Sequence, residues 1–91
     1  MSMNGGQKKA AALRYTHGED KAPKLVARGS GAVADRIIEI ARAHGIHIEE
    51  DRPLLEVLSS LDLYQEIPPE LYKAVAEILV FVYKLNKKVA G

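Results

Sequence analysis

Residues 10–28 read AAALRYTHGEDKAPKLVAR, and this stretch decides how the chain folds. From Ala10 to Tyr15 apolar residues alternate with others, which is the period-two pattern of a strand with one buried face. Residues 16–20 form a polar turn sequence, and Pro23 precedes residues 24–28, which contain the consecutive apolar residues Leu25, Val26 and Ala27. A consecutive apolar run suits a strand covered on both faces. The stretch therefore predicts two strands joined by a turn.

A helix is expected directly after the second strand. Gly29-Ser30-Gly31 leads into it, with Ser30 as the N-cap, and Gly45 ends it because glycine readily adopts positive φ. Its apolar face consists of residues at helical spacing: Val33, Ile37, Ile40, Ala41 and His44. The alternating triplet Ile46-His47-Ile48 then predicts a third strand, with both isoleucines inward and His47 outward. Two parallel strands joined by a helix would form a right-handed βαβ crossover.

Two further helices follow. Asp51 is expected to cap the first of them, which has Pro53 in its first turn and ends before Tyr64. Its apolar side consists of Leu54, Leu55, Leu58 and Leu61. The last helix begins at Pro68-Pro69-Glu70 and runs to about Asn86.

The last helix has an apolar arc about 200° wide, which exceeds what a single contact with a sheet requires. We therefore expect it to pack against both the sheet and the second helix. Lys73, Glu77, Lys84 and Lys87 mark its polar side, where Val80 is the one apolar residue. The expected fold is a small single-domain α/β fold, with a three-stranded mixed sheet, a βαβ unit and about three helices. Residues 1–9 are expected to form a flexible arm, and residues 10–88 the domain.

Composition limits the classes of protein to consider. The 91 residues suffice for one domain, and 47% hydrophobic with 27% charged residues favours a folded chain over a disordered one. The absence of cysteine rules out disulfides and thiolate metal sites, and it fits a reducing compartment such as the cytoplasm. The apolar run at residues 78–83 is far shorter than the ~20 residues that a membrane span needs. A formal net charge of +1 identifies no partner.

No set of residues predicts catalysis or a cofactor. His44 and His47 with residues 49–51 could in principle bind a divalent metal, but a helix-end histidine, an outward strand histidine and a helix-capping turn explain them better. Ser59-Ser60 lacks a histidine partner at a recognisable spacing, and Gly29-Ser30-Gly31 matches no phosphate-binding motif. We therefore predict no catalytic residue, no metal ligand and no cofactor.

Four segments together resemble one known family. They are residues 11–15, residues 20–27, residues 38–46, and residues 67–77, which read IPPELYKAVAE. This pattern resembles the cytoplasmic C-terminal domain of the FlhB/YscU-like export-apparatus switch family over residues 10–86. In that family a self-cleaving Asn-Pro-Thr-His loop precedes the first strand, and full-length members have an upstream transmembrane region. Here Thr16-His17 follows a tyrosine and no Asn-Pro pair occurs, so we expect a domain of this kind without the autocleavage loop or the transmembrane region.

The resemblance implies a non-enzymatic interaction module of flagellar or type III secretion, which binds export substrates or components of the export gate. In the family, an apolar depression on this domain receives a short motif of export substrates. The matched strands supply the expected partner-binding residues, which are Ala12, Leu13, Arg14, Tyr15, Pro23, Leu25 and Val26. The expected location is the cytoplasm, peripheral to the inner face of the cytoplasmic membrane. Lack of the upstream strand would leave an open sheet edge for an extended peptide or a second copy of the chain.

Two other functions remain as alternatives. Lys8, Lys9, Arg14, Arg28 and the basic C-terminal end suggest a small nucleic-acid-binding or regulatory protein. No RNA-binding signature accompanies these residues, and the near-zero net charge weighs against this alternative. A hydrolase built on the acidic turn and the histidines ranks last, because the chain offers no nucleophile.

Overall fold

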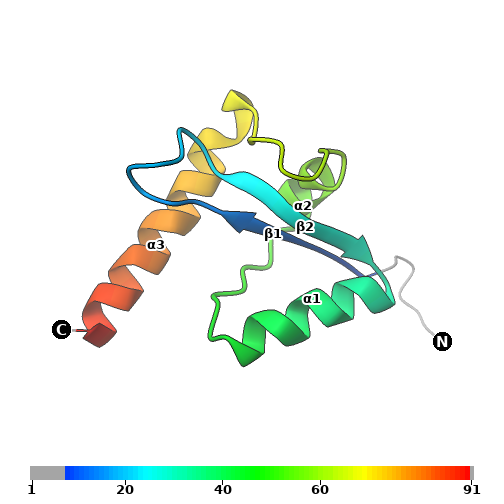
Figure 1. Cartoon of the computed structure of the whole chain (residues 1–91), viewed down its shortest axis with the longest axis horizontal. Coiled ribbons are helices and arrows are strands. Elements are labelled where there is room, and N and C mark those ends of the chain that lie inside the picture. Colours follow the sequence, from blue (N-terminus) through cyan, green and yellow to red (C-terminus); the bar gives the residue numbers. More distant parts are fainter. Residues whose placement is uncertain (1–7, 91) are drawn as a thin grey trace.

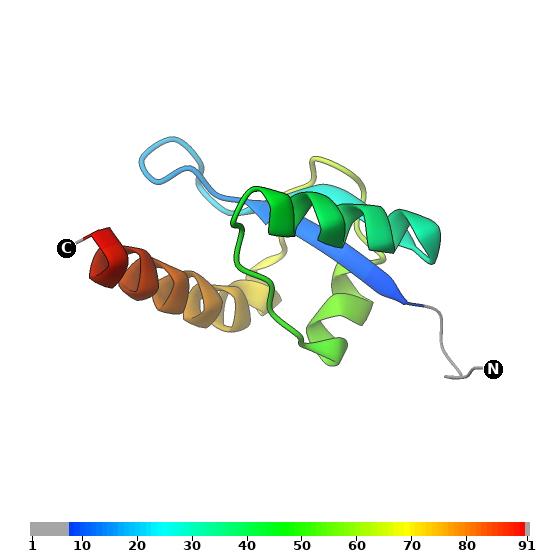
Figure 2. The ribbon, with the colours of Figure 1, turned by 90° about the horizontal axis from the view of Figure 1, so that it is seen from below.

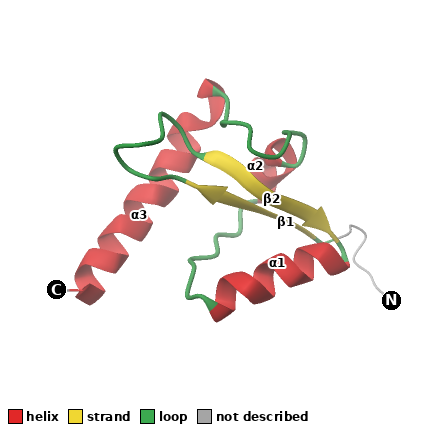
Figure 3. Ribbon diagram, viewed as in Figure 1, coloured by secondary structure: helices red, strands yellow, loops and turns green. Residues whose placement is uncertain are grey.

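The computed structural model describes residues 8–90, with side chains described as far as Leu85. Two strands form a hairpin, and three helices surround it (Figures 1 and 3). In chain order the elements are β1 (Lys9–Arg14), β2 (Lys24–Ser30), α1 (Ala32–Ala43), α2 (Arg52–Leu58), a 3-10 turn (Pro69–Leu71) and α3 (Tyr72–Ala90). Of the expected N-terminal arm, residues 1–7 lie outside the described residues, and Lys9 is already part of β1.

The hairpin of β1 and β2 confirms the first two predicted strands. They pair in antiparallel orientation, with Ala12 opposite Ala27 and Leu13 opposite Leu25, so an irregularity in β2 leaves Val26 without a partner. The polar turn between them closes on itself, because the Thr16 backbone N–H donates to the Asp20 carboxylate over 2.8 Å. The turn chemistry of the sequence thus brings the two strands together.

The predicted third strand is wrong, and the βαβ unit is wrong with it. In residues 8–90 the sheet has two strands in the order β1-β2. Ile46 instead caps the end of α1, because its backbone N–H donates to the Ala41 carbonyl over 2.8 Å. Ile46 and Ile48 are 59% and 39% exposed, whereas the His47 ring lies 5.3 Å from the Phe81 ring. The segment therefore turns its histidine inward toward α3, the reverse of the orientation that strand alternation predicts.

Residues 64–67, rather than a third strand, pair with the start of β2. The Leu25 backbone N–H donates to the Gln65 carbonyl over 3.0 Å, and the Ile67 N–H donates to the Pro23 carbonyl over 2.9 Å. Lys24 and Glu66 form an isolated antiparallel bridge. Tyr64 adopts a φ of 67°, which turns the chain at this contact. The second half of the chain is thus hydrogen-bonded to the hairpin.

Helix α1 begins and packs differently from the prediction. Gly31 rather than Ser30 is its N-cap, with a φ of 59°, because Ser30 still belongs to β2. Ala34 is its buried residue, while Val33 and Ile40 of the predicted face are exposed. The short Ala34 side chain allows the helix to lie close to the hairpin. Gly45 ends the helix with a φ of 67°, as the sequence predicts.

Helix α2 follows the prediction closely. The Asp51 carboxylate accepts the Leu54 backbone N–H over 3.1 Å, and a proline lies in the first turn. Leu54 and Leu58 are buried in a core cluster with Leu61. The helix ends at Leu58, well before Tyr64.

The core lies where the hairpin, α2 and the first half of α3 meet. Leu25 of β2 and Val75 of α3 are its largest fully buried side chains, and Leu54 and Leu58 of α2 belong to the same cluster. Val75 of α3 thus shares one buried cluster with residues of both the hairpin and α2, whereas Tyr72 and Tyr83 of the wide apolar arc stay exposed. The second half of α3 extends away from the hairpin (Figures 1 and 2), and Phe81 there is half exposed. No helix within residues 8–90 has both the length and the apolar content needed to cross a bilayer.

The Asp51 cap gives a stability test. Asp51→Ala removes the acceptor of the Leu54 N–H, so the free energy of unfolding should fall by about 0.5–2 kcal/mol in urea denaturation. Asp51→Ser should restore most of that loss, because serine is also a good N-cap. Glu50→Ala changes the neighbouring exposed carboxylate and should have little effect. Equal destabilisation by both alanine variants would contradict the role of the cap.

Candidate functional site

An apolar groove lies between the connection of β1 to β2 and helix α3, with a volume of about 320 Å³. One wall is the connection between β1 and β2. The other wall is α3 together with Ile67. The lining residues are Tyr15, Lys21, Ala22 and Pro23 on the first wall, and Ile67, Tyr72, Val75, Ala76, Leu79 and Val80 on the second. We call this surface the apolar groove.

The floor of the apolar groove is part of the core. Ala22, Ile67 and Val75 line it and are almost fully buried in the same cluster. The hydrogen bond from the Ile67 N–H to the Pro23 carbonyl joins the two walls at their base. The groove therefore has a rigid base, since moving either wall would disrupt core packing.

The rim of the groove keeps large side chains in contact with solvent. Tyr15, Tyr72 and Val80 are 39%, 46% and 51% exposed. The Tyr15 ring also meets the His17 ring edge-on, with 6.3 Å between centroids. Concave apolar surfaces with a few polar groups at the rim are typical of binding sites. The groove offers apolar contact area, together with two tyrosine hydroxyls and one lysine.

The structure separates the seven predicted partner-binding residues. Tyr15 and Pro23 line the apolar groove. Leu25 is 0% exposed, and Leu13 packs against the core cluster. Ala12 and Val26 are half-buried strand residues, and Arg14 is exposed opposite Lys24. Two of the seven residues thus lie in the groove, whereas Leu25 and Leu13 contribute to the hydrophobic core.

The partner-binding residues predicted from the sequence include none from the second wall of the groove. Its members on α3 are Tyr72, Val75, Ala76, Leu79 and Val80. One signal was present, because the apolar arc of this helix is wider than core packing requires. Val80 was another, since it stands alone among charged residues on the predicted polar side and here lines the groove.

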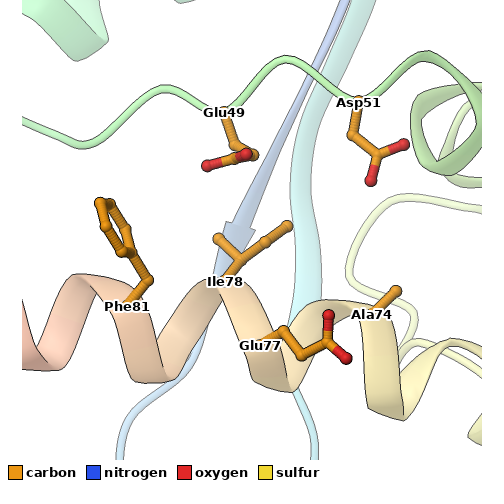
Figure 4. Close-up of a pocket in the computed structure, with 6 residues that line it drawn as sticks. All are labelled: Glu49, Asp51, Ala74, Glu77, Ile78 and Phe81. Atoms are coloured by element: carbon orange, nitrogen blue, oxygen red, sulfur yellow. The ribbon is translucent and has the colours of Figure 1, made fainter.

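A second hollow of about 300 Å³ lies beside α3, where the helix faces residues 46–51 (Figure 4). Glu49 and Asp51 come from that segment, and α3 provides Ala74, Glu77, Ile78 and Phe81. At 100° per residue, these α3 positions lie on the side of the helix opposite the apolar groove. We call this surface the acidic hollow.

Two of the three carboxylates around the acidic hollow have local partners. Glu49 lies 2.9 Å from the Nε2 atom of His47, and Asp51 caps α2. The Nδ1 atom of His44 lies 2.9 Å from the Ile40 carbonyl, so the two histidines face different groups. Within residues 8–90, no group of three or more histidine and acidic side chains is arranged to hold a metal ion.

The basic residues near the start of the chain also have partners. Lys8 lies 2.8 Å from Asp35, and Lys9 lies 3.1 Å from Glu56. These carboxylates reduce the positive charge that the nucleic-acid-binding alternative requires.

Hairpin, helices and groove define a small α/β domain with one hydrophobic core and an apolar concave surface. The chain belongs to the FlhB HrpN YscU SpaS family, since the model of that family matches residues 7–82.

Individual relatives agree with this assignment. The chain is 48% identical over 82 residues to the uncharacterized protein YlqH of Bacillus subtilis (strain 168). The matched region covers 90% of this chain and 88% of YlqH. It is 42% identical over 81 residues to the flagellar biosynthetic protein FlhB of Aquifex aeolicus (strain VF5). This matched region covers 88% of this chain but 23% of FlhB. The crystal structure of the cytoplasmic domain of FlhB from Shewanella putrefaciens superposes with a TM-score of 0.81 at 33% identity, covering 91% of this chain and 69% of that one. The domain is therefore of the FlhB cytoplasmic type.

The different positions of Leu25 and Tyr15 predict different effects of substitution. Leu25→Ala opens a cavity in the core and should lower the free energy of unfolding by about 2–5 kcal/mol in urea denaturation. Tyr15→Ala removes a half-exposed side chain at the groove rim and should lower it by less than about 1 kcal/mol. A Leu25→Ala protein as stable as the wild type would contradict the position of this residue in the core.

Proposed function

We propose that this domain acts in protein export as a non-enzymatic interaction module, whose apolar groove binds a short apolar segment of an export substrate or export-gate component. The groove carries the proposal, because it combines a buried floor with half-exposed apolar rim residues. Membership of the FlhB HrpN YscU SpaS family and similarity to flagellar biosynthetic proteins support the setting in export.

The geometry of the groove suits a weak, reversible partner. An apolar side chain of the segment would lie over Ala22, Ile67 and Val75, with Tyr15 and Tyr72 on either side. Complete burial of one such side chain contributes about 1.5–3 kcal/mol, and part of this is offset by the loss of translational freedom on binding. Two or three such contacts contribute about 3–9 kcal/mol before that offset, whereas a micromolar affinity needs about 8 kcal/mol, so we expect binding no tighter than micromolar. Weak binding allows a substrate to be released after it has been recognised.

The same proposal assigns the domain no autocleavage. In the family the cleavage loop is an Asn-Pro-Thr-His sequence before the first strand, whereas Thr16-His17 follows β1 and the sequence contains no Asn-Pro pair. An asparagine side chain at such a bond is the group that attacks the backbone in the family. The domain would therefore act through binding alone. Its proposed location is the cytoplasm, at the inner face of the cytoplasmic membrane, and its similarity to the cytoplasmic domain of FlhB supports the cytoplasmic part of this proposal.

A charge placed in the groove tests the proposal. Ala76 is exposed on α3 and lines the groove, so Ala76→Glu should leave the fold intact while it introduces a carboxylate against the apolar segment. We expect this change to weaken binding of an apolar peptide from an export substrate at least tenfold in calorimetry, because burying the new charge is costly.

Ala32→Glu is the matched control, since it introduces the same group at an exposed position in the first turn of α1. It should bind the peptide like the wild type. Circular dichroism would show that both variants are folded. Wild-type affinity in the Ala76→Glu protein, or absence of binding in the wild type, would refute the proposed function.

The outer edge of β1 is a second candidate binding surface. Within residues 8–90, the backbone of this strand hydrogen-bonds to β2 and to no other segment. The corresponding edge of β2 is already occupied near Leu25 by residues 64–67. An exposed strand edge can pair with an extended peptide or with another copy of the same chain. We include homodimerisation through this edge in the proposal.

Sedimentation equilibrium tests pairing through the edge of β1. A dimer formed in this way should dissociate on dilution, and the β1 amides should exchange hydrogen more slowly in the dimer. This part of the proposal would be wrong if the protein stayed monomeric at all concentrations and if no export-substrate peptide slowed hydrogen exchange of the β1 amides.

A further inference from the structure

We infer that the apolar groove selects segments in which an acidic side chain lies beside the apolar ones, and that Lys21 is the residue that recognises the charge. This inference rests on the proposed function and specifies the substrate class of the same groove. The occupant is a short apolar segment of an export substrate that carries at least one Asp or Glu next to its apolar residues.

Lys21 is the charged residue that lines the apolar groove. It is exposed, and no salt bridge or side-chain hydrogen bond within residues 8–90 occupies its ammonium group. Its acidic neighbour Asp20 is already engaged, because that carboxylate accepts the Thr16 N–H over 2.8 Å. The ammonium group at the rim is therefore available to a ligand.

The opposite wall adds positive charge at its outer side. Lys73 precedes Ala76 by three residues, and Lys84 follows Val80 by four, so each lies on the helix face beside a residue that lines the groove. Both lysines are exposed. Glu77 shares this part of α3, but its side chain lines the acidic hollow. No acidic residue is among those that line the apolar groove.

Opposite charge on the two flanks of α3 would direct a ligand to one of them. Glu49, Asp51 and Glu77 surround the acidic hollow, whereas Lys21 borders the apolar groove (Figure 4 shows the former). An acidic apolar segment is repelled from the acidic hollow and attracted to the apolar groove. The net charge of +1 conceals this local separation of charge.

Three peptides with the same apolar residues test the inference. They differ at one neighbouring position, which carries Asp, Asn or Lys, and binding is followed by fluorescence anisotropy at low ionic strength. We expect the Asp peptide to bind about three- to tenfold more tightly than the Lys peptide, since exposed ion pairs contribute modestly. The preference should decrease as salt is added, because the Debye length is about 10 Å at 0.1 M.

Two charge variants locate the effect. Lys21→Glu should abolish or reverse the preference for the Asp peptide. Arg28→Glu changes the net charge by the same amount at an exposed position toward the other end of β2, and it should keep the preference. Circular dichroism would establish that both proteins are folded.

The outcomes separate the inference from the proposed function. If all three peptides bind the wild type equally and Ala76→Glu weakens each of them, the charge preference is refuted while the apolar groove remains a binding site. If Arg28→Glu removes the preference as fully as Lys21→Glu, the effect is one of net charge and the assignment to Lys21 is wrong. If no peptide binds, both proposals fail together.

Discussion

The burial of Leu25 is the interaction on which the rest of the structure depends. Its side chain is fully enclosed in a cluster with Val75 of α3 and Leu54 and Leu58 of α2. Its backbone N–H bonds to the Gln65 carbonyl, so the same residue joins the hairpin to the second half of the chain through both side chain and main chain. A two-stranded hairpin is only marginally stable by itself, and these contacts supply the apolar cover that it needs.

The apolar groove is a consequence of this arrangement. Because Ala22 and Val75 must meet in the core, the residues on either side of them are held above it as two walls. Tyr15 and Tyr72 then remain half exposed, since no other described element covers that side of α3. The groove is thus an uncovered continuation of the core, which explains why it is both apolar and firmly supported.

Much of the fold was predictable because the signals were local. The turn at residues 16–20, the Asp51 cap and the positive φ of Gly45 each depend on neighbouring residues, and the structure contains all three. Alternation at residues 46–48 was misleading, because three residues cannot distinguish a strand from an extended loop whose middle side chain packs on a helix. There, contact between His47 and Phe81 outweighed the local pattern.

The sequence by itself determined the two strands, the approximate extents of the last two helices and the membership of the FlhB HrpN YscU SpaS family, since these depend on local periodicity, turn chemistry and matched segments. It also identified Tyr15 and Pro23 as binding candidates, but it could not separate them from Leu25, which has the same apolar character and is buried. Only the tertiary structure decided which apolar residues of α3 enter the core and which line the groove. The physical reason is that exposure depends on contacts between the hairpin connection and α3, which lie far apart in the chain.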